Sequence, residues 1–212
     1  YLEISDDGGL RWDRLGRVLE KQIHRFASNT NQPERISVYL TREPTITSRL
    51  YRIASVWDTE SDWIRADLSG QDLTGLDFSS INLSEAKFHN TTLTNTSFSQ
   101  ATLIKAEFNG SAINGANFTK ANADEASFQD VTGTEPLFPE ATLTNANFSR
   151  ANLHGSDFTR AQMDGAQAQQ ATLRQSVFLR ADMDLVNFTL CDCALSSFQN
   201  ANLRQATFVG AD

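Results

Sequence analysis

Bulky apolar residues recur at every fifth position through most of the chain. From Ser61 onward, positions whose numbers end in 3 or 8 are mostly Leu or Phe, and positions that end in 1 or 6 are mostly Ala, Ser or Thr. A period of five fits neither the 3.6-residue turn of an α-helix nor the two-residue alternation of a strand. It fits a chain that turns a corner after each short extended stretch, so the pattern predicts a flat-sided solenoid.

The register holds without a slip to Asp212, and thirty five-residue units fill residues 61–210. Representative units are Ala66-Asp67-Leu68-Ser69-Gly70, Ala116-Asn117-Phe118-Thr119-Lys120 and Ala201-Asn202-Leu203-Arg204-Gln205. Inside a narrow tube each wall has room for one bulky and one small side chain, because two bulky ones would collide across the axis. We therefore expect these two positions of each unit to point inward and the polar positions to point outward.

These units resemble the A(D/N)LXX signature of the pentapeptide-repeat family over about 150 of the 212 residues. The resemblance implies a mainly β fold, a right-handed parallel quadrilateral β-helix in which four units complete one coil of twenty residues. Residues 61–212 would then form about seven and a half coils of this solenoid.

Phe repeats at twice the five-residue period. It occupies every position that ends in 8 from 78 to 208 except Ala168, and Leu or Met fills most of the intervening centres. Ten residues are half a coil, so two opposite walls should carry columns of Phe. Phe78, Phe98 and Phe118 would stack at the usual strand separation of roughly 4.8 Å.

Residues 1–60 lack the repeat and are predicted to form a small α/β cap over the first coil, whose open end must be covered. Apolar residues at helical spacing predict a helix within Leu10–Ser28, after an Asp-Asp-Gly-Gly start signal. Ile36–Leu40 predicts a strand, and the apolar residues between Leu50 and Trp57 favour a second helix, with a strand there left open. The sequence shows no cap at the far end, which predicts a further domain or a dimer contact there.

The formal net charge of −8 is unevenly distributed. Residues 1–60 hold nine acidic and nine basic side chains, whereas residues 61–212 hold seventeen and nine. An acidic rod repels nucleic acid and anionic lipid and attracts basic surfaces. No apolar run reaches the eighteen or so residues that cross a bilayer, and no signal segment opens the chain. We therefore expect a soluble protein, cytoplasmic or secreted into a host cell, whose partner is another protein and neither nucleic acid nor a membrane.

The residue types that could carry chemistry are few. Cys191 and Cys193 occupy the two inward slots of one unit, which favours structural packing, and two residues so close on one extended segment are poorly placed for a disulfide. His24, His89 and His154 do not cluster in the sequence. No nucleophile elbow, phosphate loop or zinc signature is present. The sequence therefore predicts no catalytic residue, no metal site and no cofactor.

One unit pair departs from the repeat. Residues 131–140 keep the count but place Gly133 at a bulky centre and Pro136 in an inward slot, where we expect a ladder N–H to be lost. The wall should bulge here. It is either a tolerated irregular coil or a loop that contacts a partner through Glu135 and Leu137.

Outward positions become apolar near the C-terminal end, at Val177, Leu179, Leu185, Leu190 and Leu195. Arg160 and Arg180 are twenty residues apart and should stack on one wall beside that region. Arginine together with exposed aliphatic side chains is typical of an interface. The candidate partner-binding residues are Arg160, Arg180, Leu179, Leu185, Leu190, Leu195, Glu135 and Leu137.

Two functions agree with these observations. The first is a non-catalytic protein–protein interaction module that recruits a partner or substrate for a larger bacterial protein. Pentapeptide-repeat domains that resemble this one form the substrate-recruiting part of some secreted HECT-like ubiquitin ligases, so the resemblance also implies a ligase effector as the parent.

The alternative is a DNA-mimicking inhibitor of a type II topoisomerase (gyrase), as the resemblance to fluoroquinolone-resistance repeat proteins implies. Acidic charge and a rod shape agree with it. The basic residues that dilute the acidic ones, such as Arg150 and Arg174, and the lack of a C-terminal helix pattern argue against it.

Overall fold

The computed structural model describes residues 63–212 and four short strands nearer the N-terminus. These strands are β1 (Leu2–Ile4), β2 (Leu10–Trp12), β3 (His24–Arg25) and β4 (Ile36–Ser37). β1 pairs antiparallel with β2, and β3 pairs antiparallel with β4.

The helix predicted within Leu10–Ser28 is wrong at the residues where it can be compared with the structure. Leu10–Trp12 and His24–Arg25 are paired strands. The Gly-Gly dipeptide before Leu10 is as typical of a hairpin turn as of a helix start, and Trp12 prefers strands. Pairing with Leu2–Ile4 therefore outweighs the helical spacing of the apolar residues.

The strand predicted over Ile36–Leu40 is confirmed at Ile36–Ser37. Residues 38–40, the second predicted helix at 50–57 and the predicted boundary near residue 60 lie outside the described residues. The role of residues 1–60 as a cap therefore stays a prediction.

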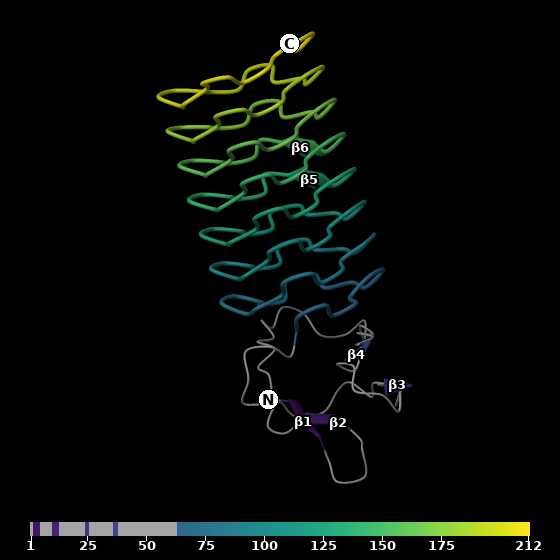
Figure 1. The fold of residues 1–212 in the computed structure, drawn as a ribbon. Helices are drawn as coiled ribbons and strands as arrows, with labels where there is room; N and C mark the ends of the chain where they lie inside the picture. Colours follow the sequence, from purple (N-terminus) through teal and green to yellow (C-terminus); the bar gives the residue numbers. More distant parts are fainter. Residues whose placement is uncertain (1, 5–9, 13–23, 26–35, 38–62) are drawn as a thin grey trace.

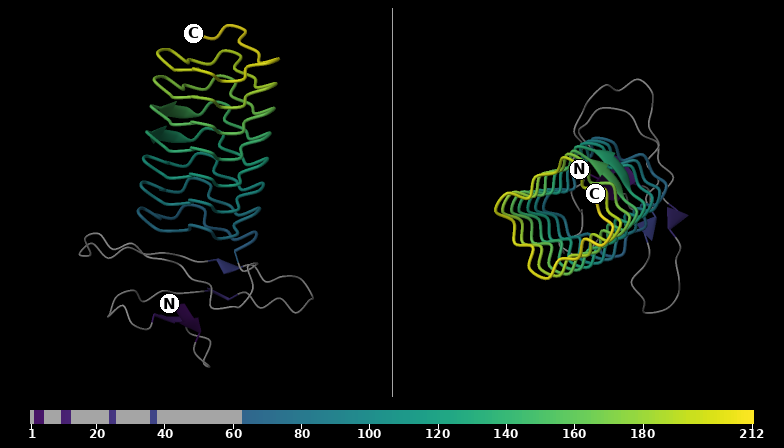
Figure 2. Two further views of the ribbon diagram at one scale, coloured as in Figure 1. Left: turned by 90° about the vertical axis from the view of Figure 1, so that its left-hand side faces the viewer. Right: turned by 90° about the horizontal axis from the view of Figure 1, so that it is seen from above.

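From residue 63 onward the chain winds into stacked coils of twenty residues (Figure 1). Parallel bridges join outward residues twenty positions apart, as from Asn117 to Leu137 and from Leu137 to Asp157. Seen along its axis, the stack has four sides, and successive coils nearly superimpose (Figure 2). The quadrilateral β-helix predicted from the five-residue period is confirmed.

Each wall is defined by its inward bulky residues, which recur every twenty positions. Wall A contains the centres from Leu68 to Phe208, wall B those from Leu73 to Cys193, wall C those from Phe78 to Phe198 and wall D those from Trp63 to Leu203. The strands β5 (Thr132–Thr134) and β6 (Asn152–His154) are neighbouring stretches of wall B and pair in parallel.

The two predicted Phe columns fill the interior along walls A and C. Within a column the rings stack, as between Phe108 and Phe128, whose centroids are 4.8 Å apart. Rings of opposite walls meet edge to face, as Phe108 does with Phe118 at 5.5 Å. Both arrangements are favourable for aromatic quadrupoles. Each buried ring thus contacts neighbours in its own coil and in the next.

Every residue from 65 to 210 whose number is a multiple of five has a positive φ, although most of these residues are not glycine. At most corners the N–H of the next residue closes a turn, as Ala116 N donates to Ile113 O at 3.1 Å. The left-handed region costs a residue with a Cβ roughly 1–2 kcal/mol. From residue 65 to residue 190, a hydrogen bond from the corner N–H to the following coil offsets this cost. Lys120 N, for example, donates to Pro139 O at 2.9 Å.

Pro136 does not make the wall bulge, so that prediction is wrong. The N–H of a residue in its slot does not join the backbone ladder between coils, which uses the carbonyl of that residue. The Pro136 carbonyl accepts the Asp157 N–H at 3.1 Å, and the Leu137 N–H donates to Ala116 O at 2.9 Å. The proline therefore removes one turn hydrogen bond and leaves the ladder continuous.

Gly133 is explained by the residue one coil earlier. A Cβ at this position would lie 2.9 Å from Cγ1 of Ile113 and 3.2 Å from its backbone carbonyl. The space for a bulky centre is already occupied, so glycine keeps β5 in register with β6.

Candidate protein-binding surface

The outward face of wall C is apolar in two of its coils. Most coils carry polar residues there, such as Ser97 and Asn117, whereas residues 137 and 139 and residues 177 and 179 are apolar. Leu137 and Val177 lie in one column and are 38% and 37% exposed. The neighbouring outward column of the same wall holds Pro139, Thr159 and Leu179, in chain order.

The two predicted arginines lie at one corner of wall C. The Arg160 N–H donates to the carbonyl of Leu179 at 2.8 Å, which places Arg160 directly beside Leu179 and Arg180. The stacking expected from their twenty-residue separation is confirmed. Leu195 and Glu135 lie at the opposite corner, in the column of residues 135, 155, 175 and 195.

Six of the eight candidate residues therefore border or cover one wall. They are Glu135, Leu137, Arg160, Leu179, Arg180 and Leu195. We call the group formed by Val177, Leu179, Arg160, Arg180 and Leu195 the wall C patch. Pro139 was not among the candidate binding residues predicted from the sequence. Counting back from Leu179 in steps of twenty would have placed it on the same face.

Leu185 and Leu190 do not belong to this group. Each five-residue step turns a corner, so Leu185 lies between walls D and A, and Leu190 between walls A and B. The Leu185 N–H donates to Arg204 O at 2.9 Å, and the Leu190 N–H donates to Val209 O at 2.8 Å. These two leucines are each 55% exposed, but they face away from the wall C patch.

Leu195 combines exposure with backbone strain. Its side chain is 78% exposed and its φ is 64°. Every corner of the solenoid has this backbone conformation, but a bulky residue rarely occupies it. The exposed leucine thus gains little from burial to offset its conformational cost.

The charges around the patch are only partly paired. Glu140 lies between Lys120 and Arg160, with N–O distances of 3.7 Å and 3.9 Å. Asp157 accepts the Thr159 N–H at 2.8 Å. Arg180 is exposed and forms no ion pair within the described part of the chain. Its guanidinium is therefore available to a carboxylate from outside.

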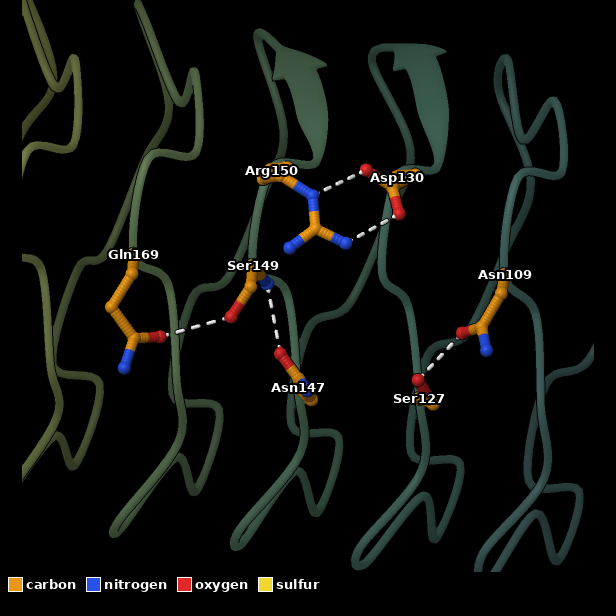
Figure 3. Close-up of polar contacts among 7 residues, drawn as sticks. All are labelled: Asn109, Ser127, Asp130, Asn147, Ser149, Arg150 and Gln169. Carbon is orange, nitrogen blue, oxygen red and sulfur yellow. Dashed lines mark hydrogen bonds and ion pairs between the residues drawn. The ribbon is translucent and has the colours of Figure 1, made fainter.

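On wall A, by contrast, outward polar side chains of neighbouring coils pair with one another (Figure 3). At its corner Arg150 makes two hydrogen bonds of 2.7 Å to the carboxylate of Asp130. This bidentate contact holds the pKa of Asp130 below its usual value. Ser149 donates to the Gln169 side chain at 2.9 Å.

One histidine of the solenoid has a carboxylate partner. His89 Nε2 lies 2.6 Å from a carboxylate oxygen of Glu107. Within the described residues no group of three or more potential ligands could hold a metal ion. Those residues also include no helix with the length and hydropathy of a membrane span.

Family models match two consecutive parts of the chain. The model described as a pentapeptide repeat region matches residues 61–135, and the model of pentapeptide repeats in eight copies matches residues 138–175. Together they cover just over half of the chain. The protein belongs to the pentapeptide-repeat family.

Solved structures of pentapeptide-repeat proteins are similar to this chain. HetL from the cyanobacterium Nostoc sp. strain PCC 7120, involved in heterocyst differentiation regulation, is 17% identical with a TM-score of 0.46, over 71% of this chain and 86% of HetL. A trypsin-treated variant of QnrB1, a plasmid-mediated fluoroquinolone resistance protein, is 18% identical with a TM-score of 0.42, over 76% and 87% of the two chains. A thylakoid lumen protein of Arabidopsis thaliana is 29% identical with a TM-score of 0.26, over 57% and 70%. A search of curated proteins gives no match.

Proposed function

We propose that this chain is a non-catalytic protein-interaction module and that the wall C patch is its binding surface. One observation carries the proposal. Val177 and Leu179 point outward in columns that otherwise hold mostly short polar residues, beside an Arg180 that has no ion pair among the described residues. The solenoid is stabilised by its inward residues, so these exposed apolar side chains and this arginine do not contribute to its stability.

The chemistry of the patch defines the partner. Exposed aliphatic side chains gain about 25 cal/mol for each Å² of apolar surface removed from water. The planar guanidinium of Arg180 can bind a carboxylate through two parallel hydrogen bonds. The partner segment should therefore present aliphatic side chains beside an acidic one.

Site-specific photo-crosslinking tests this proposal. A photoreactive amino acid is placed at Leu179 in one variant and at Leu190, on a different wall, in the other. We expect Leu179 to give a covalent adduct with a defined protein and Leu190 to give none with that protein. Equal yields from both positions would contradict the assignment to wall C.

A more specific version of this proposal is that the chain recruits a substrate for a larger bacterial protein, such as a ubiquitin ligase effector. It is supported by the family resemblance alone. The reading frame downstream of Asp212 tests it, because a ligase-like catalytic sequence would support this role and an immediate stop codon would contradict it.

The gyrase-inhibitor alternative is favoured by one feature, the acidic side chains of Asp164, Asp182 and Asp184 near one another on wall D. Partial burial and the nearby Asp182 raise the pKa of Asp164. Asp184 is itself paired with Arg204 at 2.8 Å, and most acids at the corners are paired with a base one coil away, as Glu85 is with Arg65 at 2.7 Å. A DNA mimic needs a continuous negative surface, which these pairs interrupt.

A gyrase supercoiling assay separates the two functions. We expect full supercoiling activity in the presence of micromolar protein. Inhibition under these conditions would favour the DNA-mimic function over the binding module.

A further inference from the structure

The two cysteines of the sequence face each other inside wall B. Cys193 occupies the bulky centre and Cys191 the small slot of the same unit, and both are free thiols. Cys193 is 7% exposed and Cys191 is 1% exposed. Their sulfur atoms are 3.2 Å apart. Two residues so close on one extended segment were expected to be poorly placed for a disulfide, yet the two sulfur atoms are in contact.

The reason is the corner geometry of the unit. Both slots of a pentapeptide point to the axis, so the side chains converge instead of running parallel. In the other coils of wall B the central residue is larger than cysteine, as at Leu153 and Leu173. The exception is Gly133. Cysteine at this centre brings a second sulfur within reach. A disulfide needs the sulfurs to approach by about a further 1 Å, a movement that rotation of the two short side chains can supply.

The two thiols are chemically distinct. The hydrogen bond between the two thiols lowers the pKa of Cys193. The same hydrogen bond, together with burial, raises the pKa of Cys191. The more exposed sulfur is thus also the one that ionises more readily, and a thiolate is the reactive form of cysteine.

We propose that Cys191 and Cys193 form a reversible intrachain disulfide when the protein meets a two-electron oxidant of the hydroperoxide class. The Cys193 thiolate attacks one oxygen of hydrogen peroxide, the O–O bond breaks, and the other oxygen leaves as water after taking a proton. The Cys191 sulfur then attacks the resulting sulfenic acid, the S–O bond breaks, and a second water leaves with the Cys191 proton. Two thiols lose two electrons in total, and one peroxide becomes two waters.

Two backbone hydrogen bonds hold the segment that contains this pair. The Cys193 N–H donates to Asp212 O at 3.0 Å, and the Asp212 N–H donates to Cys191 O at 3.1 Å. They join the thiol segment to the neighbouring stretch of chain. Local opening of these bonds, without unfolding of the solenoid, admits the oxidant.

Intact mass and thiol counting test the proposal directly. The folded chain is treated with hydrogen peroxide, denatured, alkylated and compared with an untreated sample. We expect both alkylatable thiols to be lost, with a mass decrease of two hydrogens, and a dithiol reductant to restore both. Retention of both thiols, or a product linked only between chains, would overturn the proposal.

Single variants identify the attacking sulfur. Serine fits the slot of Cys191, as Ser111 and Ser176 do elsewhere, and alanine fits a bulky centre, as Ala123 does. In Cys191→Ser we expect a sulfenic acid on Cys193 that a 1,3-dicarbonyl probe traps, because no second thiol resolves it. In Cys193→Ala we expect the remaining thiol to stay alkylatable. Trapping on Cys191 alone would contradict the assigned roles.

Discussion

Walls A and C share one interior and differ in what they present to solvent. Both have a stacked Phe column, and rings of the two columns contact each other across the axis. Outside, wall A pairs Arg150 with Asp130 and joins its polar side chains from coil to coil. Wall C exposes Val177 beside an Arg180 that has no ion pair within the described residues.

The difference separates the residues that determine the fold from those that determine binding. Inward slots repeat with little variation, because every coil must fill the same narrow tube. Outward side chains can vary, because the backbone groups of these positions form most of their hydrogen bonds with the backbone of neighbouring coils. A binding surface can therefore be placed on one wall without altering the solenoid.

The largest expected effect tests whether the interior is common to both walls. Phe118→Ala removes a ring from wall C and Phe128→Ala one from wall A, and both rings are fully buried. Each substitution should lower the free energy of unfolding by about 3–5 kcal/mol, to a similar extent. Urea denaturation followed by circular dichroism measures this loss. A large loss for one ring and none for the other would contradict a shared core.

A smaller effect concerns the strained corner of wall C. Leu195→Gly should raise the free energy of unfolding by about 1 kcal/mol, because glycine adopts a positive φ without the cost that leucine incurs. The matched variant Asn95→Gly lies in the same corner column and should change stability less, since asparagine tolerates this conformation. A loss of stability in Leu195→Gly would show that the exposed side chain is stabilising within the chain itself.

The smallest effect contrasts the two arginine corners. Arg150→Gln should lower the urea midpoint slightly at neutral pH, whereas Arg180→Gln should leave it unchanged. Because Arg150 lowers the pKa of Asp130 in the folded protein, this contribution is present above the ordinary pKa of Asp130. It is lost as the pH falls through the lowered value. The two variants should therefore differ at neutral pH and converge in strong acid.

The repeat region could be predicted closely because a single sterically demanding slot recurs every five residues. Counting in fives assigned the inward position of Phe118, and counting in twenties placed Arg160 beside Arg180. The outcome at Pro136 was missed because the count does not reveal which backbone groups join the coils. Of the short strands near the N-terminus, β4 was predicted, whereas β2 and β3 were missed because their pairing is nonlocal and the apolar spacing in that segment also fits a helix.

The candidate surface was predicted only in part, for a related reason. Leu185, Leu190 and Leu195 follow one another every five residues and look like one patch in the sequence. Each step turns a corner, so they face different directions in the folded protein. The Cys191 and Cys193 contact was missed because an ordinary strand was assumed where the unit bends toward the axis.

The affinity of matched double variants for the crosslinked partner tests the central claim most directly. Val177→Asp with Leu179→Thr copies Asp157 and Thr159 from the preceding coil. The control, Leu185→Gln with Leu190→Gln, uses the residues that Gln205 and Gln170 supply in the same columns. We predict that the wall C variant binds at least about tenfold more weakly, a loss of about 1.4 kcal/mol or more, while the control binds as the unmodified chain does. Equal affinity of the wall C variant and the unmodified chain would contradict wall C as the binding surface.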